Sequence, residues 1–166
     1  MRNKNTASKI AFLSISIALA MILAFVESQI PALVAIPGVK IGLPNIVIVF
    51  ILYKFGWKEA VITNLTRVLL VSILFGNVQS MILGLSGAIL SLLGMILLKR
   101  WFAPTTVSVV GGILHNVGQV GAACIVMQTA GLVSYLPFLL VSGIIAGILI
   151  GIISALLLKK LEKLKF

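Results

Sequence analysis

Arg67 is the side chain with the clearest chemical potential in this sequence, because it stands alone in an apolar stretch. It lies about nine residues into a predicted helix, and so about 13 Å deep at the helical rise per residue. An arginine at that depth in a membrane costs several kcal/mol and marks a functional site by default. The alternative is a structural arginine that snorkels to the interface or ties two helices together through backbone carbonyls.

A second polar group is predicted in another apolar helix, which contains His115, Asn116 and Gln119. Gln119 follows His115 by four residues, so the two share one face of a helix, and Asn116 lies beside them. Several glycines in the same stretch leave room for a cavity wall. A lone buried histidine is more often a hydrogen-bonded core residue, but three polar groups together favour a binding site.

The segment from Ile36 to Asn45, IPGVKIGLPN, interrupts two apolar runs and is predicted to form a structured turn. Its prolines fix φ and its glycines accept positive φ. Lys40 and Asn45 in this segment, and Gln79 in a later turn, are predicted at one level at the outer mouth of the helices. Lys40, Arg67 and protonated His115 would suit a phosphate, a carboxylate or a similar anion, although a solvated loop lysine is the ordinary case.

Several other chemistries are disfavoured by the composition. The chain has no aspartate, three glutamates and one cysteine, Cys124, so no metal cluster, magnesium-diphosphate site or internal disulfide is predicted. It has no G-x-x-x-x-G-K-[ST] motif for ATP, and no acidic partner is evident for His115 in nucleophilic catalysis. We therefore expect neither an enzyme nor a bound cofactor.

The elements that must position these residues are membrane helices. The 166 residues are 61% hydrophobic with a mean hydropathy of +1.26, more apolar surface than a soluble domain of this size can bury. The prediction is an all-α, polytopic membrane protein with a single integral membrane domain, residues 1–166. Its six transmembrane helices are predicted at about 8–28, 43–56, 58–75, 79–98, 105–129 and 136–158.

The basic residues predict the orientation. With the N-terminus inside, eleven of the thirteen fall in cytoplasmic segments, Lys40 falls outside, and Arg67 lies within a span. The eleven are Arg2, Lys4, Lys9, Lys54, Lys58, Lys99, Arg100, Lys159, Lys160, Lys163 and Lys165. Both termini are therefore expected in the cytoplasm. The same clusters explain the net charge of +10 by membrane topology, so no nucleic acid is expected as a partner.

Small residues four apart predict close helix contacts on two helices. Ser16, Ala20 and Ala24 share one face of the first helix. On the sixth helix, the residues at this spacing are Gly143, Gly147, Gly151 and Ala155.

The string Pro37–Ile46, PGVKIGLPNI, resembles the PG(V/I)KLGLAN motif of the family called heptaprenyl diphosphate synthase component I, or Gx transporter. Further similarity is in Arg67–Leu70 with Phe75-Gly76, Ser86–Ala88 and Gly112–Gln119, and the resemblance covers about residues 10–158. Ile41 and Pro44 depart from the motif, which has leucine and alanine there, without changing its charge.

That family is similar to the substrate-binding S-components of energy-coupling factor (ECF) transporters. The resemblance implies an S-component-like bundle in the bacterial cell membrane that captures a small, anionic, isoprenoid or vitamin-like ligand from outside. Its partners would be a transmembrane T-component and two cytoplasmic ATPases, with Ser16, Ala20 and Ala24 as the docking face and residues 29–42 as a lid. The alternatives are a non-catalytic membrane subunit of a prenyl (heptaprenyl) diphosphate synthase and, with less support, a stand-alone carrier, for which no inverted repeat is visible.

Overall fold

The computed structural model describes residues 2–29 and 41–162, and the regular structure within these ranges is entirely helical. This confirms the all-α prediction. The elements are α1 (Arg2–Gln29), α2 (Asn45–Lys54), α3 (Trp57–Phe75), α4 (Val78–Leu98), α5 (Pro104–Val126), the 3-10 helix η1 (Ala130–Tyr135) and α6 (Leu136–Lys160). The segment between the fifth and sixth predicted helices thus contains a short helix of its own, and α5 ends three residues earlier than predicted.

The helices begin and end where the sequence provides the local signals. Pro104 is the first residue of α5, where its missing N–H costs nothing. Asn77 caps α4 in a capping box, accepting from the Ser80 backbone while the Ser80 hydroxyl accepts from the Asn77 backbone. Gly56, with φ of 120°, allows the sharp turn between α2 and α3, a conformation that residues with a side chain rarely adopt.

The predicted count of six membrane spans is confirmed only in part. Among the described residues, four helical stretches are long and apolar enough to cross a membrane: Thr6–Gln29, Val78–Leu98, Pro104–Val126 and Ala130–Lys160. The ten-residue α2 is about 15 Å long, half of a bilayer core. The nineteen-residue α3 carries Lys58 and Glu59 besides Arg67. Six spans therefore do not follow from length and composition alone.

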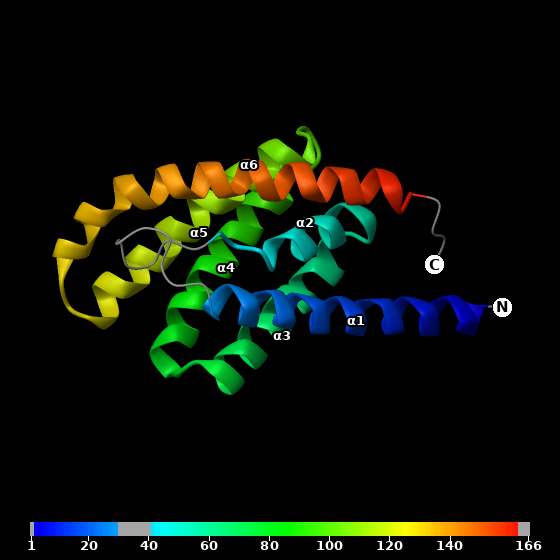
Figure 1. Cartoon of the computed structure of the whole chain (residues 1–166), viewed down its shortest axis with the longest axis horizontal. Helices are drawn as coiled ribbons and strands as arrows, with labels where there is room; N and C mark the ends of the chain where they lie inside the picture. The colour runs from blue at the N-terminus through cyan, green and yellow to red at the C-terminus, as the bar shows by residue number, and fades with distance from the viewer. Residues whose placement is uncertain (1, 30–40, 163–166) are drawn as a thin grey trace.

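The short α2 occupies the centre of the fold, between α1 and α6 (Figure 1). Its residues 47–52 are all buried, and Ile48, Ile51 and Leu52 are completely so. They form the main core cluster together with Ala20 of α1 and Ile150 of α6. The unbroken apolar sequence of α2 is therefore explained by packing on all sides.

Close backbone contacts fix α5 against α4 on one side and α6 on the other. A Cβ added at Gly147 of α6 would lie 2.6 Å from the Val109 Cα, and one at Gly112 would lie 2.5 Å from the Gly143 carbonyl oxygen. On the other side, a Cβ at Gly118 would lie 2.8 Å from the Ser86 carbonyl oxygen. The predicted small-residue face of α6 is thus a real helix–helix contact.

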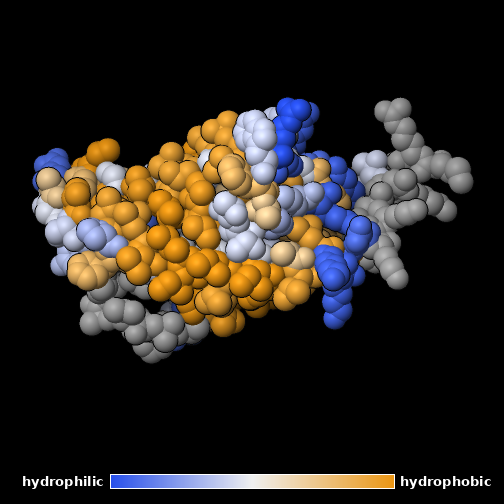
Figure 2. Space-filling model, turned by 90° about the horizontal axis from the view of Figure 1, so that it is seen from above, coloured by the Kyte–Doolittle hydropathy of each residue, from blue (hydrophilic) through white to orange (hydrophobic). Residues whose placement is uncertain are grey.

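Both termini of the chain lie at one end of the bundle (Figure 1), which we call the basic end because several described lysines have their contacts there. There Lys9 pairs with Glu59 at 2.5 Å, Lys54 donates to the Leu161 carbonyl, and Lys99 donates to the Leu52 carbonyl. Between this hydrophilic end and the other, the surface seen in Figure 2 is a broad apolar band. This is the distribution that a bilayer requires.

Candidate functional site

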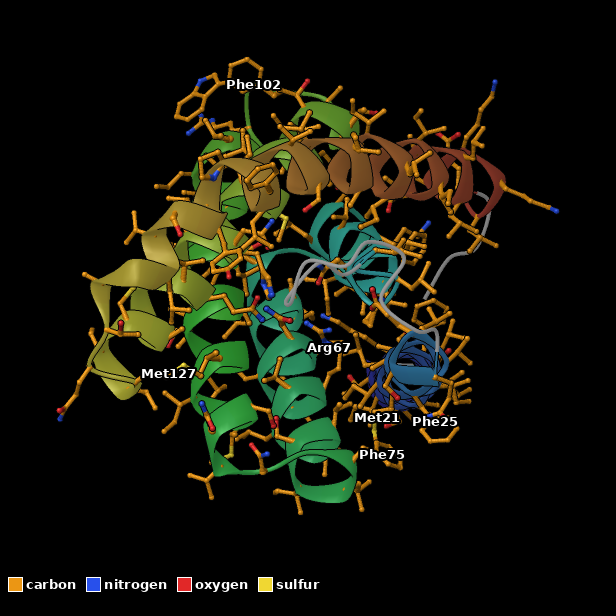
Figure 3. All side chains as sticks on the ribbon, turned by 60° about the vertical axis from the view of Figure 1, so that its left-hand side comes forward. Met21, Phe25, Arg67, Phe75, Phe102 and Met127 are labelled. Carbon is orange, nitrogen blue, oxygen red and sulfur yellow. The ribbon has the colours of Figure 1, made fainter. Side chains whose placement is uncertain are left out.

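A cavity of about 400 Å³ lies inside the bundle and is lined by residues of all six α-helices. It reaches Ser28 at the end of α1, Phe75 at the end of α3, and Ser80 at the start of α4. Since α1 and α3 both start at the basic end, these residues lie at the opposite end. At this rim of the cavity, the rings of Phe25 and Phe75 pack together with their centroids 5.0 Å apart and join α1 to α3 (Figure 3).

Arg67 is the central polar group of the cavity and lies in the interior of the bundle (Figure 3). It is 8% exposed. Its Nη2 donates to Asn64 Oδ1 at 2.6 Å and, at 3.4 Å, to Asn45 Oδ1. Its Nε has no hydrogen-bond partner among the described residues. A buried donor without a partner is costly, so this site favours an acceptor group brought by a ligand.

Two asparagines hold the arginine in place. Asn64, one turn before it on α3, uses its amide nitrogen to donate to the Ala88 carbonyl of α4 at 3.3 Å. Asn45 is the first residue of α2, directly after the predicted turn. The guanidinium is therefore tied to α2, α3 and α4 together. Asn64 was not among the predicted site residues, although its spacing from Arg67 on the helix is visible in the sequence.

The predicted polar face of α5 lines the same cavity, with His115, Asn116 and Gln119 all present. His115 packs against Gly87 of α4, where a Cβ would lie 3.0 Å from its ring. Asn116 donates to the Leu139 carbonyl of α6 at 2.5 Å, so it also joins two helices. The structure therefore brings Asn45, Arg67 and the α5 group around one hollow.

Other predicted residues lie elsewhere. Gln79 is exposed and is not part of the cavity lining, although its neighbour Ser80 is. Lys40 lies outside the described residues. The predicted docking face of α1 is turned inward in this structure: Ser16 and Ala20 are buried, and Ala24 lines the cavity.

The prediction missed Glu27, the carboxylate of the cavity. Glu27 lies near the end of α1, and its Oε1 accepts from the backbone N–H of Gly42 at 2.5 Å. It lines the same cavity as Arg67, and α1 packs against α3. The sequence contains a signal that could have identified it, because Glu27 is one of only three acidic residues in the chain and lies at the end of an apolar helix.

The arrangement is suited to binding. The lining combines one guanidinium, one carboxylate, one imidazole and several amides and hydroxyls with apolar side chains such as Val49, Val68 and Ile150. Among the described residues, no group of three or more His, Cys, Asp and Glu is placed to hold a metal ion. A concave, partly apolar hollow with a few convergent polar groups is typical of a small-molecule site.

Comparison with known proteins adds one match. No curated protein and no solved structure matches the chain. The model of one protein family, described as heptaprenyl diphosphate synthase component I, matches residues 16–157, which include α2 to α5 completely and nearly all of α6. The chain therefore belongs to the heptaprenyl diphosphate synthase component I family.

Proposed function

We propose that the chain is a non-catalytic membrane subunit that captures a small ligand bearing an anionic group, as the S-component of an ECF-type importer does. The observation that carries the proposal is Arg67, which is buried in the wall of a cavity of about 400 Å³ and whose Nε has no hydrogen-bond partner among the described residues. Asn45, His115, Asn116 and Gln119 complete the contacts with the ligand. Lys40, which lies outside the described residues, is a further proposed contact.

The direction of capture follows from the charges. The basic end belongs in the cytoplasm, so the rim formed by Ser28, Phe75 and Ser80 faces the exterior of the bacterial cell. All six helices lie within the membrane region, with α2 shielded from lipid by its neighbours. ATP hydrolysis would come from two cytoplasmic ATPases, joined to this chain through a transmembrane T-component.

A second candidate is favoured by the family match: a non-catalytic membrane subunit of a prenyl diphosphate synthase. The apolar part of the cavity would then hold part of an isoprenoid chain while a soluble partner performs the transfer. The position of the cavity argues for the first candidate, because a reaction in the cytoplasm would place its diphosphate at the basic end.

Co-purification separates the two candidates. The tagged chain is isolated from its own cells in mild detergent, with untagged cells as the control, and the retained proteins are identified. We expect a T-component and two proteins with Walker motifs in stoichiometric amounts, and ATP hydrolysis in the purified complex. Recovery of a soluble prenyl synthase that loses activity without this chain would instead establish the second candidate.

A further inference from the structure

The described cavity lining contains two fully charged side chains, which are opposite in sign and form no ion pair with each other. Arg67 uses Nη2 on Asn64 and Asn45, and Glu27 uses Oε1 on the Gly42 N–H. The single ion pair among the described residues joins Lys9 to Glu59 at the far end of the bundle. Glu27 and Arg67 nevertheless line the same cavity, on helices α1 and α3, which pack against each other. The space beside them is therefore bounded by a cation on α3 and an anion on α1.

Such an arrangement favours a ligand with opposite charges of its own. Each charge is costly to keep out of water unless it is matched, and the unused Nε–H of Arg67 needs an acceptor. A ligand that gives an anionic oxygen to Arg67 and an N–H group to Glu27 satisfies both. A diphosphate would also supply an acceptor for Arg67. It would, however, place roughly three negative charges close to the carboxylate of Glu27.

We infer that Glu27 is a specificity-determining residue that limits the cavity to zwitterionic ligands and rejects multiply charged anions such as isoprenyl diphosphates. The inference rests on the proposed function, since it takes the cavity as the ligand site. It goes beyond that function by assigning the net charge of the ligand. Glu27 also holds Gly42, so the same carboxylate links ligand charge to the backbone that leads into α2.

The test compares wild-type protein with Glu27→Gln in lipid nanodiscs, using isopentenyl diphosphate as the probe in calorimetric titrations. Glutamine keeps an acceptor for Gly42 and removes the charge. We expect Glu27→Gln to bind the probe about tenfold more tightly than wild type, or better, because a repulsive charge in the cavity lining is gone. Glu59→Gln is the matched control, since Glu59 faces Lys9 outside the cavity, and it should bind as wild type does.

The absence of a gain in Glu27→Gln, or an equal gain in Glu59→Gln, overturns the inference. Native mass spectrometry of the wild-type protein provides a test that needs no variant: the retained small molecule should contain both an acidic and a basic group. A retained diphosphate would contradict the proposed specificity for zwitterionic ligands, but the cavity would remain a ligand site. If the protein retains no small molecule and has no ATPase partners, the proposed function itself is contradicted.

Discussion

Replacing Arg67 with alanine is expected to weaken ligand binding by about 30-fold or more, the loss typical when one partner of a buried, hydrogen-bonded charge contact is removed. The variant loses the cation that the ligand contacts and leaves Glu27 as the remaining full charge in the described lining. It also leaves the Asn64 carbonyl oxygen without its 2.6 Å donor. The measurement is the fraction of protein that retains its small molecule in native mass spectrometry after gentle purification.

Two variants make the Arg67 result interpretable. Arg67→Lys keeps the charge but not the planar set of donors, and should fall between wild type and Arg67→Ala. Arg100→Ala removes an exposed basic residue at the other end of the bundle and should retain the ligand fully. If Arg67→Ala is folded and retains ligand at the wild-type level, the arginine is a structural tie and the anion contact proposed for it is wrong.

The second large effect is expected when one methyl group is added where α6 packs against α5. Gly147→Ala should destabilise the protein by about 1–3 kcal/mol, because overpacking of a tight contact requires the backbones to separate. The added Cβ would lie 2.6 Å from the Val109 Cα and 2.9 Å from the Ser108 carbonyl oxygen. Since these neighbours are backbone and not flexible side-chain ends, the strain cannot be relieved locally. Reversible unfolding in mixed detergent micelles measures the difference in the free energy of unfolding.

The same substitution at Gly121 is the matched control. Gly121 lies on α5 as well, but a Cβ there meets nothing within 4 Å. Gly121→Ala should be neutral or stabilise the helix by up to about 1 kcal/mol, the usual difference between the two residues in a helix interior. The two alanine variants are therefore expected to differ in sign, and equal effects would contradict the close approach of α5 and α6.

The fold was predictable to the extent that it depends on local signals. Helix order and the glycine contact of α6 follow from apolar runs, prolines and four-residue spacing. The role of α2 did not follow, because a short, wholly apolar helix looks the same in sequence whether lipid or protein surrounds it. Only packing against Ala20 and Ile150 shows that it forms the core.

The candidate site was predictable where polar residues interrupt apolar helices, as Arg67 and His115 do. The predicted level of Gln79 along the bundle did not determine the direction of its side chain, which is exposed beside the lining residue Ser80. Glu27 was missed because a charge at a helix end is usually solvated, and its approach to Arg67 depends on how α1 packs against α3.

The most direct test of the account is the side from which the cavity can be reached. Ser72, on the cavity wall, is replaced with cysteine in a Cys124→Ala background, and intact cells are treated with a small, membrane-impermeant thiol reagent. Lys58→Cys reports on the basic end in the same way. The account predicts that Ser72→Cys reacts in intact cells, while Lys58→Cys reacts only after the membrane is permeabilised. Reaction of Ser72→Cys from the cytoplasmic side alone, or from neither side, would contradict a cavity that opens to the exterior.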